Sequence, residues 1–426
     1  MAENAFKADW PSFALGFNTG KSKGGSGGGA ELNIHYGMEP PEDTSKLWVS
    51  TDTPKNTQLV PSYEYETFSV PKVKLPSTIW AMGYATVGTK VYMFGGLTSS
   101  NTTYRNQIVV FDMETEEIAT SNTVLPISSK FISASAVGNK IYLFGGQSDT
   151  QTLPTIYVFD VETEEIYRST ANLPIAAYDI SSAAIGTDIY LFGGAPHNTV
   201  GRKVLLFDTI TETISTLITK LPSSTSEGSS VIEGYDASSS AVIGNKAYFF
   251  GGHYSTKINV LDAETQVVST IETKLPGVRN HMSASVVGTK VYLFGGTYGT
   301  NNYRADQIWI FDADTETIRS AGTTLSNLRA YFACASLGYN VYLLGGYYSP
   351  KTNTNSVNYS SQIEKFTTTQ HLDENNLILS ASLTDNVFDL FPSVSIGVKS
   401  VYKGNKSNEA EPVNAYIHNG DEWLPV

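Results

Sequence analysis

The stretch Lys140-Ile141-Tyr142-Leu143-Phe144-Gly145-Gly146 occurs in six versions along the chain, and this repetition decides the fold. Ile-Tyr-Leu-Phe is apolar at successive positions, so the strand that it forms must be covered on both faces. The Gly-Gly pair ends the strand and allows a positive φ or the close approach of a neighbouring backbone. The other five versions are Lys90–Gly96, Asp188–Gly194, Lys246–Gly252, Lys290–Gly296 and Asn340–Gly346.

Turn signals surround each version of this stretch. Val-Gly-Thr-Lys or Val-Gly-Asn-Lys precedes several of them and predicts a tight hairpin. Five repeats continue into Phe/Leu-Asp-x-x-Thr-x-x-Ile/Val, where Asp and Thr can hydrogen-bond the backbone of their own turn. Each repeat is therefore expected to hold four strands. The turn aspartates are Asp112, Asp160, Asp208, Asp262 and Asp312.

These repeats resemble kelch repeats, in which four strands form one blade of a β-propeller. The first glycines of the pairs lie at 95, 145, 193, 251, 295 and 345, a period near that of the family. Six copies imply an all-β, six-bladed kelch β-propeller. The family often has Trp where these repeats carry an aliphatic residue, which changes the outer core but not the implied architecture. The aliphatic residues are Ile118, Ile166, Ile214, Val268 and Ile318.

Closure of the ring is also predicted by spacing. Four turn aspartates precede the proline of a Leu-Pro pair by 14 residues, and counting back from Pro76 reaches Ser62, with Phe68 in the aliphatic position. Tyr63–Lys74 therefore has the pattern of a fourth strand without a third strand before it. We expect it to pair with Gln362–Phe366 and to complete the last blade, which removes two exposed sheet edges.

Length differences between repeats indicate which side of the disc is free to vary. Proline to the next Gly-Gly spans 19 residues in four repeats but 29 from Pro222 to Gly251, and Gly-Gly to the next turn also drifts. These segments, which include Ser223–Gly234 and Tyr347–Tyr359, are the second-to-third-strand loops and the blade-to-blade connections. Both kinds open on one side, here called the variable face. The opposite side, the hairpin face, consists of tight turns. Because loops on a rigid scaffold usually carry binding, we expect the variable face to bind.

Composition narrows the possible functions. The net charge is −13, and the five turn motifs alone hold 15 acidic residues, so nucleic-acid binding is not expected. The single cysteine, Cys334, lies in an apolar stretch and is interpreted as a buried thiol. The six histidines show no metal-ligand spacing, and no metal or cofactor is predicted. We find no signal peptide and no apolar run long enough to span a membrane.

The flanks have a different character. Residues 1–29 are predicted to be a flexible anchoring arm with a Gly-Ser linker, residues 30–60 a small β segment, residues 61–369 the propeller and residues 370–426 a C-terminal β-module. The run Met38–Val49 resembles a segment found ahead of kelch repeats in bacteriophage and prophage proteins. The ending Ala415–Val426 is similar to the C-termini of phage tail-associated proteins. We expect the two flanks to combine into one small β-module.

Candidate binding residues lie on the variable face, after each Leu-Pro and each Gly-Gly. Aromatic faces stack on sugar rings, and Arg or Asp can bind hydroxyls. Any single tyrosine is better explained as a seal for the end of a blade, but the ring as a whole favours binding. The expected ligand-binding residues are Tyr178, Asp179, Tyr235, Asp236, Tyr254, Arg279, His281, Tyr298, Arg329, Tyr331 and Tyr347.

Two classes of function fit this pattern. The first is a non-enzymatic virion protein, a phage tail or head appendage made in the bacterial cytoplasm, in which residues 1–60 and 370–426 attach to other virion or tail proteins. Its propeller would bind a host cell-surface glycan or protein. The second is a sugar-processing enzyme similar to kelch-type mutarotases, with acid–base groups near Arg279, His281, Arg329 and Asp179. An intracellular kelch adaptor is a third reading, but the helical partner-binding domain of such adaptors is missing from this sequence.

Overall fold

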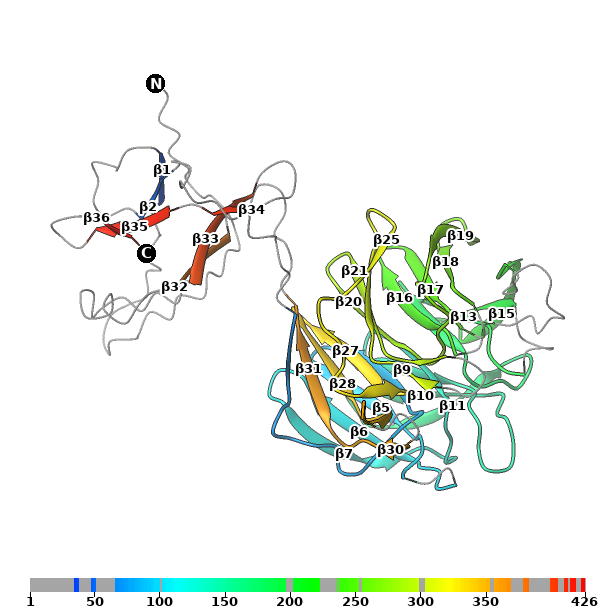
Figure 1. Ribbon diagram of the computed structural model, residues 1–426. Helices are drawn as coiled ribbons and strands as arrows, with labels where there is room; N and C mark the ends of the chain where they lie inside the picture. Colours follow the sequence, from blue (N-terminus) through cyan, green and yellow to red (C-terminus); the bar gives the residue numbers. More distant parts are fainter. Residues whose placement is uncertain are drawn as a thin grey trace. The chain divides into compact units, whose positions relative to one another are not determined.

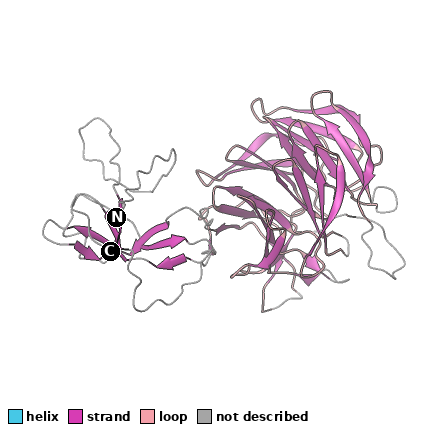
Figure 2. Cartoon of the chain, turned by 90° about the horizontal axis from the view of Figure 1, so that it is seen from above, coloured by secondary structure: helices cyan, strands magenta, loops and turns pink. Residues whose placement is uncertain are grey.

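The structure is a computed structural model. It describes residues 66–99, 102–196, 202–222, 235, 237–252, 255–298, 303–352 and 356–368, and in the flanks the backbone of short strands between residues 34 and 50 and between 378 and 425. The chain divides into two compact units, one made of Met1–Glu64 with His371–Val426 and the other of Tyr65–Gln370. The regular structure in the described residues is all β-strand, as expected (Figure 2). The described residues include no helix that is long and apolar enough to cross a membrane.

The second unit contains six four-stranded antiparallel sheets, one for each repeat (Figure 1). The first strands of successive blades contact each other all the way round, with the last in contact with the first, so they surround a common axis. Blade 1 is β4 (Gly83–Val87), β5 (Lys90–Phe94), β6 (Gln107–Asp112) and β7 (Glu117–Val124); blade 2 is β8 (Ser133–Val137), β9 (Lys140–Phe144), β10 (Thr155–Asp160) and β11 (Ile166–Asn172); blade 3 is β12 (Ser181–Ile185), β13 (Asp188–Phe192), β14 (Lys203–Asp208) and β15 (Thr213–Lys220). Blade 4 is β16 (Ser239–Ile243), β17 (Lys246–Phe250), β18 (Lys257–Asp262) and β19 (Val267–Lys274); blade 5 is β20 (Ser283–Val287), β21 (Lys290–Phe294), β24 (Ile308–Asp312) and β25 (Thr317–Ser320); blade 6 is β27 (Ala333–Leu337), β28 (Asn340–Leu344), β31 (Ile363–Thr367) and β3 (Thr67–Ser69).

The repeated Ile-Tyr-Leu-Phe stretch is the second strand of its blade, and it is buried on both faces as predicted. In β9, Tyr142 and Phe144 pack into a core shared with Phe207 of blade 3. Ile141 and Leu143 point the other way, into a core that includes residues of blade 1. Alternate residues of one strand thus join two neighbouring blades, and this burial is the main stabilising contribution to the ring.

The Gly-Gly pair clamps each blade to the next one. A Cβ on Gly193 would lie 1.9 Å from the Tyr235 carbonyl oxygen, a distance that no side chain allows. The following Gly194 donates its N–H to that same carbonyl, and equivalent bonds occur in all six blades. In the sixth, Gly346 donates to Ile79 and so joins the last blade to the first.

The tyrosine of the repeated stretch makes a second link, on the hairpin face. Tyr342 of blade 6 donates its hydroxyl to the Met113 carbonyl of blade 1 at 2.9 Å and lies 3.1 Å from a Glu116 carboxylate oxygen. That carboxylate also pairs with Lys365 at 3.0 Å. Glu164 similarly accepts a hydrogen bond from Ser121 of the preceding blade. These two glutamates therefore connect neighbouring blades on the hairpin face.

The N-terminal strand β3 is the fourth strand of the last blade. Phe68 lies opposite Phe366 in the register, which is the predicted pairing. The strand is shorter than predicted, with only an isolated bridge between Lys74 and Gln362 beyond it, because Pro71 has no N–H to continue the ladder. The remaining predicted residues, 63–65, lie outside the described part of the chain.

The first unit contains strands from both flanks. One sheet has the order β1 (Ile34–Gly37), β2 (Leu47–Ser50), β35 (Asn414–His418) and β36 (Trp423–Pro425). Within it, β2 pairs with β35 in antiparallel register, so the two flanks form one small β-module as predicted. A second sheet joins β32 (Ile378–Ser382), β33 (Lys399–Gly404) and β34 (Ala410–Pro412). The predicted arm, residues 1–29, lies outside the described residues.

Candidate binding face

One residue of each blade lies at the axis of the variable face, just before the first strand. All six have a left-handed backbone with φ between 51° and 57°, although none is glycine. Their backbones form a ring of hydrogen bonds in which each N–H donates to the carbonyl of the preceding blade, and Ala81 donates to Tyr331 to complete the circle. Five residues in the hairpin turns have a similar left-handed backbone, so this conformation belongs to the geometry of the repeat rather than to the axis alone. The six axial residues are Ala81, Phe131, Asp179, Ala237, His281 and Tyr331.

The axial side chains form a compact cluster because the two alanines leave room for the other four. Over Ala237, the His281 Nε2 and Asp179 Oδ2 atoms are 3.4 Å apart, and their side chains are 15% and 14% exposed. Tyr331 stacks on His281 with ring centroids 3.8 Å apart. Phe131 lies 5.8 Å from Tyr331 and 6.3 Å from His281, which comes from the opposite blade. We call these four residues the axial cluster.

An aromatic platform extends the axial cluster over blades 6 and 1. Trp80 makes edge contacts with Tyr331 and Tyr347 and stacks on Tyr359 at 5.9 Å. Tyr347 and Tyr359 belong to a three-stranded sheet of β26 (Leu328–Ala330), β29 (Tyr347–Ser349) and β30 (Asn358–Tyr359). The Arg304 guanidinium lies 5.2 Å from the Tyr347 ring centre and also bonds Ser356 of this loop. The platform is therefore held in place before any ligand arrives, which lowers the entropy cost of binding.

A half-buried lysine stands beside the cluster. The Lys130 ammonium lies 4.9 Å from the Phe131 ring centre and 5.5 Å from that of Tyr104. Burial lowers the pKa of Lys130, and the Asp179 carboxylate opposes this shift. No carboxylate of the described chain forms an ion pair with this ammonium, so its charge is available to a ligand.

Arg279 and Tyr298 lie on blade 5 rather than at the axis. The Arg279 guanidinium is sandwiched between the Tyr298 and Trp309 rings, 4.8 Å from each ring centre. It also donates to Gln307 at 2.6 Å. Burial lowers its pKa. Tyr298 is 40% exposed and faces Tyr303, so this pair forms a second aromatic surface at the edge of the face.

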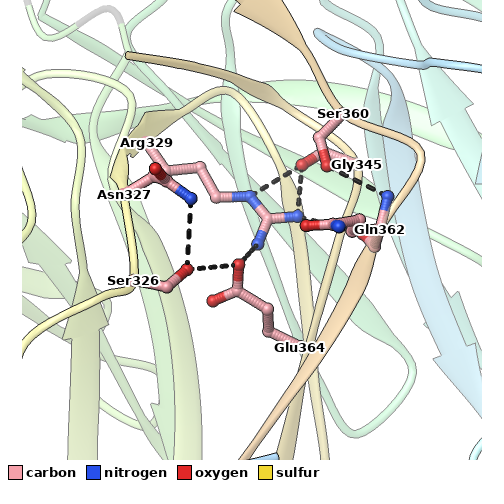
Figure 3. Close-up of polar contacts among 7 residues, drawn as sticks. All are labelled: Ser326, Asn327, Arg329, Gly345, Ser360, Gln362 and Glu364. Carbon is pink, nitrogen blue, oxygen red and sulfur yellow. Dashed lines mark hydrogen bonds and ion pairs between the residues drawn. The ribbon is translucent and has the colours of Figure 1, made fainter. Parts of the chain in front are cut away.

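Arg329 is placed differently from the sequence-based expectation. We expected its side chain on the binding surface, but it is 2% exposed. Figure 3 shows its guanidinium pairing with Glu364 at 3.3 Å and donating to the Gly345 and Gln362 carbonyls. The pKa of Arg329 is lowered by burial, which Glu364 opposes. This arginine fastens β26 to blade 6, so we assign it to the fold and leave it out of the proposed site.

The remaining predicted residues differ in where the structure places them. Tyr178 stacks on Phe131 at 5.9 Å and extends the axial cluster. Tyr235 is 1% exposed and packs between blades 3 and 4. Asp236, Tyr254 and the Ser223–Gly234 insertion lie outside the described residues. Phe131 and Trp80 were missing from the expected site. Alignment of the repeats could have found Phe131, since it occupies the same position as Asp179, His281 and Tyr331.

The chemistry on this face is that of recognition by stacking and hydrogen bonding. In the described part of the chain, no group of three or more His, Cys, Asp or Glu side chains could hold a metal ion. Cys334 is buried, and burial raises its pKa far above the usual thiol range, so it is a poor nucleophile. The Asp179–His281 pair is the acid–base group that the structure brings together, while Arg279 and Arg329 are held apart from it by their own partners.

Comparison with known proteins agrees with this architecture. Residues 82–237 match the family described as the KLHDC2/KLHL20/DRC7 Kelch-repeats domain. The match covers the first three blades and ends at the axial Ala237 of the fourth. The chain carries a kelch-repeat β-propeller. Both flanks lie outside the matched range, and no curated protein matches the chain.

Proposed function

We propose that this kelch propeller is a non-enzymatic binding module that holds its ligand over the axis of the variable face. The observation that carries this proposal is the convergence of the Phe131, Asp179, His281 and Tyr331 side chains from four blades into one cluster at the axis. Repeats that serve only to seal the ring would need no such mixture, since alanine fills the same position in the other two blades. The ligand class that fits is a host cell-surface glycan or protein, because the cluster offers both aromatic faces and polar groups.

The flanks supply the proposed setting. We propose that residues 1–60 and 370–426 attach the propeller to other virion or tail proteins. The support is the resemblance of Met38–Val49 and Ala415–Val426 to phage-encoded segments, together with the pairing of β2 and β35 in one sheet. Mass spectrometry of purified particles tests this setting. The chain should be present at a constant ratio to the other particle proteins, and its absence from particles would leave a free binding protein.

The binding role is tested with two tyrosine variants on opposite faces. Fluorescent full-length protein is applied to intact host cells and to a glycan array, beside Tyr331→Ala and Tyr339→Ala. Tyr339 is 45% exposed in the β27–β28 turn of the hairpin face and serves as the matched control. We expect Tyr331→Ala to bind about tenfold more weakly or worse, since a buried aromatic anchor contributes on the order of 2 kcal/mol. Binding lost with Tyr339→Ala, or unchanged in both variants, contradicts the proposal.

Sugar mutarotation is a second candidate, favoured by the 3.4 Å approach of His281 to Asp179. A proton acceptor and a donor at one site could open and close a sugar ring. Magnetization-exchange NMR on an α/β sugar mixture, with wild type and His281→Gln, tests it. Faster exchange of the two anomers with the wild type alone would establish the activity. Exchange at the uncatalysed rate with both would reject it.

A further inference from the structure

The two faces of the propeller differ in charge: the turn motifs of the hairpin face are acidic, and the variable face carries residues of both signs. Every turn motif of the hairpin face is acidic, with 15 Asp and Glu residues in the five motifs. On the variable face, each blade places at least one basic residue in the axis-side connection, in the second-to-third-strand loop or, in blade 4, at the first position of the third strand. One from each blade, in order, is Arg105, Lys130, Arg202, Lys257, Arg279 and Lys351.

Acidic residues are few on the described part of the variable face, and most have a cationic or imidazole partner. Asp306 pairs with Lys351 at 2.8 Å, Glu364 with Arg329, and Asp179 contacts His281. Lys130 differs from these paired cations, because no carboxylate of the described residues forms an ion pair with it, and an unpaired cation attracts an anionic group.

We infer that the ligand of the variable face is an anionic glycan, whose charged group is held by Lys130 and whose sugar ring stacks on Phe131 or Tyr331. This inference rests on the proposed binding function and names the ligand class. The Lys130 ammonium touches the axial cluster, and it is held against Phe131 without an ion pair in the described residues.

Asp179, which lies near Lys130, favours a sugar acid over other polyanions as the ligand. A carboxylate only accepts hydrogen bonds, so the ligand must present donors beside its own negative group. Sugar hydroxyls do so within the span of a single ring. Nucleic acid and acidic peptides instead bring further negative charge toward Asp179. The ligand chemistry is therefore a sugar with hydroxyls next to a carboxylate or sulfate, and the test distinguishes these two sources.

Matched polysaccharides test the inference on the full-length protein. Binding is measured for polygalacturonate and its methyl ester, for dextran sulfate and plain dextran, and for polyglutamate and a single-stranded oligonucleotide. We expect one of the two acidic glycans to bind, with affinity falling as salt rises, and its neutral counterpart to bind at least tenfold more weakly. Preference for polygalacturonate identifies a carboxylate, and preference for dextran sulfate a sulfate.

Two lysine variants locate the charge. Lys130→Met keeps the alkyl stem and should weaken binding of the acidic glycan about tenfold, as expected for loss of a charged hydrogen bond. Lys140→Met is the matched control, because Lys140 lies 5.7 Å from the Tyr167 ring centre on the hairpin face. It should bind like the wild type, and both variants should keep the wild-type melting temperature to within a few degrees.

Several outcomes would overturn the inference. These are equal binding of acid and ester, failure of every acidic glycan, stronger binding of polyglutamate or the oligonucleotide, or an unchanged affinity of Lys130→Met. None of them removes the proposed binding module, which is judged separately by the loss of cell or array binding in Tyr331→Ala. Loss of binding in Tyr331→Ala with no effect in Lys130→Met would mean that the site is real and its ligand is not held through charge.

Discussion

At the scale of single residues, position within the repeat determines role. Asp179, His281 and Tyr331 were predicted as site residues from their chemistry, and they share one axial position. The same chemistry selected Arg329 and Tyr235, which are buried. Residue type alone could not separate the two groups, because a side chain two positions before the axial residue turns into the seam between blades. The repeat position does separate them, since Tyr235 and Arg329 stand at that earlier position in their blades.

The variation at one turn position gives a stability prediction. In four blades a lysine lies across from the turn aspartate, as Lys140 does from Asp160, but in blade 3 Asp188 lies across from Asp208. The pKa of Asp188 is raised by burial and by Asp208. Asp188→Lys should therefore stabilise the propeller by about 0.2–1 kcal/mol, the range for cross-strand charge pairs. Thermal unfolding measures the gain in stability. The reverse substitution, Lys140→Asp, should lower the melting temperature. A lower melting temperature for Asp188→Lys would refute the pairing argument.

Glu66 gives a pH-dependent prediction. Its carboxylate accepts the Gly322 N–H at 2.6 Å and pairs with Arg319 at 3.5 Å, yet burial raises its pKa. A raised carboxyl pKa means that the folded state prefers the protonated form. The stabilising contribution is therefore present below the unfolded pKa and is lost as pH rises through the folded value. We expect Glu66→Gln to raise the melting temperature at pH 7, with the difference shrinking toward pH 4. A difference that grows toward pH 4 would contradict this assignment.

At the scale of elements, the Gly-Gly pair and the closing strand determine whether the ring assembles. The double-sided burial of the Ile-Tyr-Leu-Phe strand and the pairing of β3 were predictable from pattern and spacing. The second role of the glycines, a carbonyl clamp on the next blade, was not, because it depends on a contact between repeats. For the same reason the length of β3 was overestimated: spacing located the strand, while Pro71 limits its ladder.

Two glycines of blade 3 separate backbone strain from the clamp. Gly186 and Gly193 both have positive φ, of 63° and 60°, but a Cβ on Gly186 meets nothing within 4 Å. Gly186→Ala should lower the free energy of unfolding by about 1–2 kcal/mol, because a residue with a Cβ is strained in the left-handed conformation. Alanine at Gly193 should cost about 1–3 kcal/mol more, since the backbone of blade 4 must move. Denaturant unfolding compares them, and equal losses would mean that the clamp contributes nothing.

Truncation tests the closing strand. Removing residues 1–75 deletes β3 and exposes both the edge of β31 and the core shared by blades 6 and 1. We expect that variant to aggregate on size exclusion. Removing residues 1–29 spares the strand and should give a protein with wild-type elution and unfolding. A soluble, cooperatively unfolding 76–426 fragment would show that the ring closes without β3.

At the scale of the whole molecule, the account depends on the difference between the two faces. Repeat spacing predicted which face varies, and the structure places the axial cluster and the aromatic platform on that face. What the sequence could not supply was the meeting of side chains from different blades: Asp179 and His281 are 102 positions apart, and only the closed ring brings them together over Ala237. The sequence repeats predict the structure of one blade, but they do not predict contacts at the axis, where side chains of several blades meet.

Amide hydrogen exchange with and without bound glycan tests the central claim most directly. The array glycan with the strongest signal is used at saturating concentration. We predict slower exchange in peptides that contain Lys130–Ile132, Tyr178–Ile180, Arg279–Met282 and Leu328–Phe332, with no change in the hairpin turns at Asp112–Glu117 and Asp160–Glu165. Protection confined to the hairpin turns, or found only in residues 1–64 and 371–426, would contradict the account.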